Sequence, residues 1–458
     1  MFFYYLMPAV FILGILAIAF EDIIKVNKAA TAIGMSILMW AIFLIDSVGI
    51  FSTHQPVNLE PFLKGFPEFA KLPVSELAYK FIEFRMIDSL GDVATTLFFV
   101  LGSMAIIDIV DSHGGFSVIS SAIKANAPRK LLWILSFIAF FMAAILGDLA
   151  TVIVLVAIAR KLVPDRTTRL LFAGMIIISS NAGGCWSPIG DVTTLILWTG
   201  GNLTVGHQVT HLIIPSAVMM LVPLTTTTFM LPKNATLAQP AAEEGGIYSK
   251  ISPKFRKRIL IVGLSSLILI PVLQMLIQLP PFMGVLLGLV ALWIMTDRRY
   301  VGTDDEELQN LRVNRVLARV DISTVFFFLG ILMSVQALNA TGFLTEIGEF
   351  LNKTFSNANY IAMVFGVLSS FLDNVALVSA TMGMYPLAAA GDFMADSSFW
   401  TLMAYSGVCG GSILIIGSAS GVTAMGMEKI SFGYYFKKFT PSVVAGFLLG
   451  IAVFLLLF

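Results

Sequence analysis

The chain has 458 residues, of which 57% are hydrophobic and 12% are charged, whereas about a quarter of the residues are charged in soluble domains. This composition argues against a soluble domain and predicts an all-α polytopic membrane protein. The formal net charge is zero, which gives no electrostatic case for a nucleic-acid partner. The two cysteines, Cys185 and Cys409, both lie in apolar segments and predict neither a disulfide framework nor a metal site.

Apolar stretches of about 20 residues, the length that crosses a bilayer as a helix, recur along the whole chain. Ten crossings are predicted, at residues 4–20, 29–45, 94–110, 168–199, 211–231, 258–277, 282–296, 320–340, 398–427 and 440–458. Residues 131–160 and 358–390 are apolar over about 30 residues each, enough for two half-depth helices but short for two full spans. We expect both to form re-entrant helical hairpins, and the amphipathic run Ser75–Arg85 to lie along the outer membrane surface.

The basic residues set the expected orientation. Five of the 28 Lys and Arg residues fall on one side of the membrane in this threading: Lys64, Lys71, Lys80, Arg85 and Lys353. By the positive-inside rule the opposite side is cytoplasmic. Because Lys25 and Lys28 mark the first loop as cytoplasmic and the number of predicted crossings is even, we expect both termini to be extracytoplasmic.

The two halves of the chain resemble each other, which predicts one repeat over residues 1–231 and another over residues 258–458, joined by a cytoplasmic linker at 232–257. The stretch Thr95–Gly102 reappears as Ser323–Gly330. Order and spacing are kept further along for Leu146–Asp148 with Phe371–Asp373, and for Gly183, Gly184 and Gly190 with Gly410, Gly411 and Gly417. Corresponding spans enter from opposite sides in this topology, so the repeats are inverted, as is typical of alternating-access transporters. Each repeat is expected to hold scaffold helices, one hairpin and one broken transmembrane helix.

Each predicted hairpin tip carries a carboxylate, Asp148 after Gly147 and Asp373 before Asn374. A carboxylate near the bilayer centre costs at least about 2.5 to 3.5 kcal/mol. Symmetric acids at this depth therefore indicate a functional site, although both residues could instead be satisfied turn residues at the tips.

Two further interruptions are rich in glycine and polar residues, at 179–191 and 407–421. Proline and clustered glycines unwind a helix, and the exposed carbonyls and helix C-terminus can coordinate a cation. The expected sodium- and proton-binding residues are Asp148, Asp373, Asp191, Asn181, Thr193, Thr194, Asn374, Ser180 and Ser412, with Ser418 and Ser420 nearby. Sodium itself is expected at Asp148, Asp373 and Asn181.

Simpler interpretations remain open for some of these residues. Asp191 could cap the second half-helix by accepting from the backbone of Thr193 or Thr194. The two threonines could bond back to their own helix. The four histidines form no cluster in the sequence, and none is expected to be a ligand.

These motifs resemble those of NhaD-type sodium/proton antiporters of the ion transporter superfamily. The likeness rests on Gly147-Asp148, on Asn181–Gly184 followed by Pro188–Thr194, and on Leu372–Asn374, and it covers essentially the whole chain. The resemblance implies a homodimer formed by scaffold helices, in which each protomer moves a transport domain made of hairpins and broken helices. It also implies that ion binding involves Asp148, Asn181, Asp191, Thr193, Thr194, Asp373 and Asn374.

The sequence thus predicts a secondary transporter that exchanges Na⁺, with Li⁺ as a second candidate, for H⁺ across a bacterial cytoplasmic (inner) membrane by an elevator-type mechanism. Its partners are the ions and the lipid bilayer, and no cofactor is expected. A sodium-coupled dicarboxylate symporter or an oxyanion (arsenite) exporter would use the same architecture, but carboxylates at both tips oppose an anionic substrate. No nucleophile–base pair or phosphate loop indicates an enzyme.

Overall fold

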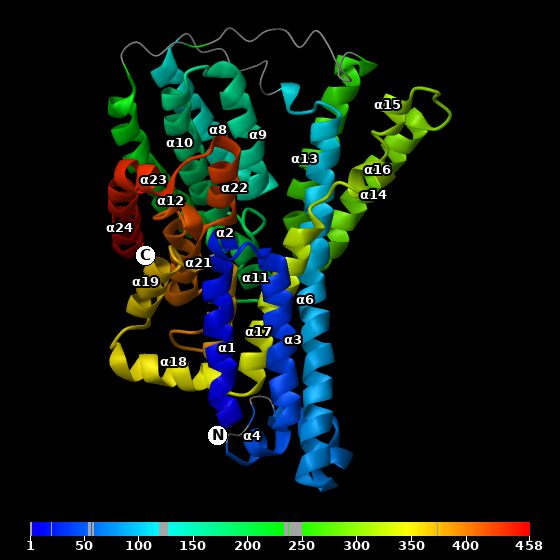
Figure 1. Ribbon diagram of the computed structural model, residues 1–458, viewed down its shortest axis with the longest axis vertical. Coiled ribbons are helices and arrows are strands. Elements are labelled where there is room, and N and C mark those ends of the chain that lie inside the picture. Colours follow the sequence, from blue (N-terminus) through cyan, green and yellow to red (C-terminus); the bar gives the residue numbers. More distant parts are fainter. Residues whose placement is uncertain are drawn as a thin grey trace. The chain divides into compact units, whose positions relative to one another are not determined.

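The computed structural model describes residues 2–19, 21–53, 56, 59–118, 127–232, 237, 250–372 and 374–458. Over these ranges the regular elements are helices, which confirms the predicted all-α class (Figure 1). The chain forms two compact units. Unit 1 comprises Met1–Phe98, Asp321–Ile361 and Val375–Met394, and unit 2 comprises Phe99–Val320, Ala362–Asn374 and Ala395–Phe458. Each unit takes segments from both halves of the sequence.

Eight helices in the described part of the chain are long and apolar enough to cross a membrane. They are α3 (Lys28–Ile45), α6 (Val74–Ser112), α8 (Pro128–Leu146), α12 (Val205–Met230), α13 (Pro253–Ile277), α14 (Pro281–Tyr300), α17 (Ile322–Ala340) and α24 (Thr440–Leu457). All but α8 coincide with predicted crossings. The other predicted crossings are α1 (Phe2–Ala19), whose apolar stretch is shorter, and the two helices predicted to be broken.

Unit 1 is organised by the packing of α17 on α3. Gly330 of α17 lies so close to the backbone of Ala32 in α3 that a Cβ at this position would collide with it. The indole Nε1 of Trp40 in α3 donates to the carbonyl oxygen of Met333 in α17 at 3.0 Å. The other elements of the unit are α1, α2 (Glu21–Ile24), α4 (Ser47–Thr53), α5 (Leu59–Gly65), η1 (Pro67–Lys71) and α18 (Phe343–Thr354).

Unit 2 is organised by α10 (Arg166–Cys185), which packs against α8, α12, α9 (Asp148–Leu162), α21 (Ser398–Gly410) and α22 (Ala419–Glu428). Helix α12 in turn packs on α24, and α13 packs on α14. The remaining elements of the unit are α11 (Val192–Thr199), α15 (Glu306–Gln309), α16 (Val313–Leu317), η3 (Ile415–Gly417) and α23 (Phe432–Lys438).

Three helices continue from one unit into the other: α6, α19 (Ala358–Leu368) and α20 (Asn374–Met384). Helix α6 is 39 residues long and contains no proline that would end it. The run Ser75–Arg85 is therefore the first part of this helix, and the prediction of a separate surface segment was wrong.

The interruptions expected from the sequence are present. Helices α8 and α9 meet at Gly147 and form a helical hairpin, while α10 and α11 are separated at Trp186–Asp191. Helices α21 and α22 are separated by a stretch that contains η3. Of the predicted second hairpin, α19 and α20 are described, but Asp373 lies outside the described residues. Most of the predicted linker, residues 233–236 and 238–249, also lies outside them.

Candidate cation-binding site

The hairpin turn places Asp148 at the first position of α9. The preceding Gly147 has φ 84° and ψ 156°, a conformation that glycine adopts without the cost of a side chain. The backbone nitrogen of Asp148 donates to the carbonyl oxygen of Gly190 at 3.0 Å, and its side chain is buried. A carboxylate here faces the partial positive charge of a helix N-terminus.

Asn181 connects the two broken helices of unit 2. It lies near the C-terminal end of α10 and is fully buried. Its Nδ2 donates to Ser412 Oγ at 2.8 Å and to Ser418 Oγ at 3.0 Å, and its Oδ1 accepts from Ser420 Oγ at 2.6 Å. The structure thus brings together four of the residues singled out in the sequence, from segments more than 200 positions apart.

Asp191 has two kinds of partner. Its Oδ1 accepts from the backbone nitrogen of Thr193 at 2.6 Å and so caps α11, as the capping interpretation expected. Asn374 Nδ2 approaches the two carboxylate oxygens at 3.4 and 3.3 Å. Asp191 therefore both ends the break in its own helix and contacts the start of α20.

The hydroxyl groups around the first break divide into two kinds. Thr194 Oγ1 donates to the carbonyl oxygens of Ser187 and Asp191, each at 2.9 Å, so it bonds back to its own segment. Thr193 Oγ1 and Ser180 Oγ are buried and have no hydrogen-bond partner within the described ranges. A buried hydroxyl without a partner loses its hydration without compensation, which makes these two oxygens available to an ion.

Matching glycine contacts occur at the two breaks. A Cβ on Gly183 would collide with the backbone of Phe140 in α8, and a Cβ on Gly410 would collide with the backbone of Gly366 in α19. The next glycine of each pair lies against a glycine beyond the break, Gly184 against Gly190 and Gly411 against Gly417. The close approaches therefore occur in both halves of the chain in the order seen in the sequence.

The chemistry of the site is that of hard oxygen donors. Carboxylates start α9 and precede α11, while α10 and α21 direct their C-terminal ends and following backbone into the breaks. Helix C-termini and unwound carbonyls suit small cations in membrane transporters. Among the described residues no group of three or more His, Cys, Asp or Glu side chains is placed to hold a metal ion. Amide, hydroxyl and carbonyl oxygens would therefore have to complete the coordination of a cation.

A family model for CitMHS, described as a citrate transporter, matches residues 1–404 of the chain. The chain belongs to the CitMHS family. Because its described residues also include eight apolar helices of membrane-crossing length, it is an integral membrane protein of a transporter family.

Relatives of this CitMHS chain include several sodium/proton antiporters. Sodium/proton antiporter 1 of Arabidopsis thaliana is 39% identical over 98% of this chain and 72% of its own length. Sodium/proton antiporter 2 of the same plant is 35% identical over 98% of both chains. The Na⁺/H⁺ antiporter NhaD of Alkalimonas amylolytica is 27% identical over 97% of this chain and 89% of its own. The resemblance to NhaD-type antiporters is therefore confirmed.

Among solved structures, the YdaH transporter of Alcanivorax borkumensis matches with a TM-score of 0.49 and 12% identity, over 82% of this chain and 87% of that chain. This likeness supports no conclusion about function.

Two residues of the CitMHS chain near the site were not singled out from the sequence. Thr151 lies one turn along α9 from Asp148 and is fully buried, and its hydroxyl lacks a hydrogen-bond partner in the described part of the chain. Ser187 donates from Oγ to the carbonyl oxygen of Ala144 in α8 at 2.6 Å and so joins the break to the hairpin. The spacing of three residues from Asp148 could have indicated Thr151, because such residues share a helix face. No local signal indicates the partner of Ser187.

Proposed function

We propose that this CitMHS-family chain exchanges Na⁺ for H⁺ by alternating access of the elevator type. The observation that carries the proposal is that the ends of the half-helices hold both the buried carboxylates Asp148 and Asp191 and the hydrogen-bond network of Asn181. The names of the relatives, sodium/proton antiporters at 35% and 39% identity, support the same ions.

Competition between the two ions couples their fluxes in this scheme. Asp148 and Asp191, together with Asp373, bind either protons or Na⁺ but not both at once. Either load neutralises carboxylates that would be costly to carry as ions through a dry interior. An empty site with two repelling charges crosses the barrier poorly, and this penalty suppresses uncoupled leak.

The N-terminal and C-terminal ends of the half-helices have different roles in the proposed site. The N-terminal ends of α9 and α11 stabilise Asp148 and Asp191 in the charged state. The C-terminal ends of α10 and α21 supply partial negative charge and unwound carbonyls for the cation. Thr193 and Ser180 offer hydroxyl oxygens without competing bonds within the described residues.

The description of the family as citrate transporters raises an organic-anion substrate as the alternative. A citrate or dicarboxylate ion at this site would meet the buried charges of Asp148 and Asp191. Like charges in a poorly hydrated site repel strongly. The site therefore favours a cation over citrate, dicarboxylate or oxyanion substrates.

Further features of the proposal follow from the NhaD-type resemblance and from the distribution of basic residues. We propose a homodimer in a cytoplasmic membrane with both termini extracytoplasmic, and Li⁺ as a second transported ion. In this proposal, the inverted repeats at residues 1–231 and 258–458 account for the two states between which the transporter alternates.

The test is transport by the purified protein in proteoliposomes that contain a pH-sensitive dye. Addition of Na⁺ or Li⁺ is expected to dissipate an imposed pH gradient, whereas K⁺, citrate and succinate are expected to leave it unchanged. Asp148→Asn is expected to abolish the response to Na⁺, because the amide cannot exchange a proton for a cation.

The matched control is Asp297→Asn, which neutralises an acid at the far end of α14, bonded to Arg312 and Trp293. This variant should exchange at the wild-type rate. Full Na⁺-driven exchange by Asp148→Asn, or citrate uptake without Na⁺/H⁺ exchange by the wild type, contradicts the proposed function.

A further inference from the structure

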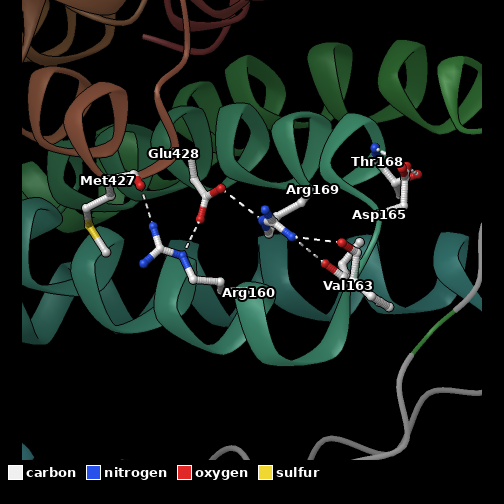
Figure 2. Close-up of polar contacts among 8 residues, drawn as sticks. Arg160, Val163, Asp165, Thr168, Arg169, Met427 and Glu428 are labelled. Carbon is white, nitrogen blue, oxygen red and sulfur yellow. Dashed lines mark hydrogen bonds and ion pairs between the residues drawn. The ribbon is translucent and has the colours of Figure 1, made fainter.

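A further buried carboxylate of unit 2 lies away from the cation site and joins three helices. Glu428 is the last residue of α22, and its side chain is only 2% exposed. Its Oε1 accepts from Arg160 Nε of α9 at 2.8 Å, and its Oε2 accepts from Arg169 Nε in the first turn of α10 at 2.9 Å (Figure 2). One carboxylate thus fastens α22 to both α9 and α10.

The two arginines also bind backbone at the same place. Arg160 Nη2 donates to the carbonyl oxygen of Met427 in α22. Arg169 Nη1 donates to the carbonyl oxygens of Val163 and Pro164, each at 3.0 Å, just after the end of α9 (Figure 2). Carbonyls at a helix C-terminus lack partners within the helix, and cations stabilise them. Arg160 and Arg169 therefore satisfy backbone carbonyls near the ends of α22 and α9, and together with Glu428 they link these helices.

The same three helices carry the cation site at their opposite ends. Asp148 precedes Arg160 by twelve residues on α9, and Asn181 follows Arg169 by twelve residues on α10. Ser420 precedes Glu428 by eight residues on α22. At about 1.5 Å per residue, the cluster lies about 12 to 18 Å along each helix from the site. Splaying the helices at the Glu428 end would therefore shift the oxygens at the other end.

We propose that Glu428 is a positioning residue for the cation site: with Arg160 and Arg169 it clamps three half-helices so that Asp148, Asn181 and Ser420 keep the spacing that Na⁺ requires. This proposal for Glu428 rests on the proposed function for the identity of the transported ion, Na⁺. It also requires that the three helices move as one body during transport, because the hydrogen bonds at both ends hold them together.

The charge of Glu428 is maintained by its partners. Burial by itself raises the pKa of this carboxyl, but the hydrogen bonds and charges of Arg169 and Arg160 outweigh burial and hold the pKa below its ordinary value. Removal of the charge leaves two guanidinium groups with no common acceptor. Arg160, which is half exposed, can turn to water, and the link between α9 and α22 is lost.

The first experiment measures Na⁺-driven exchange in proteoliposomes over a range of Na⁺ concentrations. Glu428→Gln is expected to raise the Na⁺ concentration for half-maximal exchange about tenfold, the size of effect seen when groups that orient metal ligands are removed, with little change in the maximal rate. Arg160→Gln, a milder change at a half-exposed residue, should act in the same direction. Glu428→Asp keeps the charge but is one methylene shorter, so it should restore part of the affinity.

Asp297→Asn is the matched control, since it removes an ion pair with Arg312 whose two residues lie outside α9, α10 and α22. An unchanged half-maximal Na⁺ concentration in both Glu428→Gln and Arg160→Gln, beside an active wild type, overturns the clamp. A loss confined to the maximal rate overturns it as well, because a general loss of folded protein has that signature. Absence of exchange by the wild type itself instead rejects the proposed function.

A second experiment needs no transport. Thr151 is fully buried near Asp148 with an unpartnered hydroxyl in the described ranges, so Thr151→Cys is a mild reporter once the buried Cys185 and Cys409 are replaced by alanine. Glu428→Gln should speed labelling of this cysteine by an aqueous maleimide several-fold, and Asp297→Asn should not. Equal labelling rates in the two backgrounds contradict the clamp whatever ion is transported.

Discussion

The helix pair α3–α17 of unit 1 and the broken helices of unit 2 satisfy their buried polar groups in different ways. In α17 the hydroxyl of Ser334 bonds to the carbonyl oxygen of Gly330 in its own helix at 2.7 Å. Beside the hydrogen bond from Trp40 to Met333, the contact with α3 depends on shape at Gly330. In unit 2 the amide of Asn181 bonds to side chains of another broken helix.

This contrast separates stability from function. An unbroken helix satisfies its own backbone and offers carbonyls to its hydroxyl side chains, so its partners are chosen by packing. An unwound segment at membrane depth must find partners elsewhere. Substitutions in the first region should therefore change folding, and those in the second should change ion binding.

Among the substitutions that compare these two regions, Asn181→Ala should have the largest effect on transport. It removes three side-chain hydrogen bonds and leaves the hydroxyls of Ser412, Ser418 and Ser420 without their amide partner, at about 1–3 kcal/mol for each group left unsatisfied. Na⁺-driven exchange in proteoliposomes should fall about 100-fold or more, equivalent to about 2.7 kcal/mol.

The control for that loss is Asn339→Ala in α17, whose side-chain amide makes no hydrogen bond among the described residues. It should exchange Na⁺ at close to the wild-type rate. Equal losses of Na⁺-driven exchange in Asn181→Ala and Asn339→Ala would contradict the distinction between the broken helices and the pair α3–α17.

Gly330→Ala should destabilise unit 1. The new methyl group collides with the backbone of Ala32, which can only give way if α3 and α17 separate, and overpacking of this kind costs about 1–3 kcal/mol. Thermal unfolding of the detergent-solubilised protein measures the loss. Gly34→Ala in α3 is the same change in open space, and it should leave stability unchanged or slightly raised, since alanine favours a helix over glycine.

The smallest expected effect concerns pH. The folded-state pKa of Glu428 is depressed, so its contribution to stability is present above the ordinary value of 4.5 and is lost only as the pH falls through the lower folded-state value. Glu428→Gln should therefore leave the shape of the exchange–pH profile unchanged at every pH above about 5. A shifted midpoint in that range would make Glu428 a participant in proton exchange and not a positioning residue.

Much of the fold was predictable because its signals are local. Long apolar runs predicted the helices, and the glycines and proline of 179–191 and 407–421 predicted the breaks between α10 and α11 and between α21 and α22. The turn at Gly147 places a carboxylate at the start of α9 as expected. The run Ser75–Arg85 was misplaced because amphipathicity describes the faces of a helix and not where the helix ends.

By itself, the sequence determined which segments are helical, where they break, and which buried positions carry oxygen donors. Only the tertiary structure decided the partners: Asn181 with three serines 231 to 239 residues away, and Glu428 with arginines 268 and 259 residues away. The physical reason is that helix propensity and hydrophobic periodicity act over a few neighbouring residues, whereas the choice of a distant polar partner depends on how complete helices pack against one another.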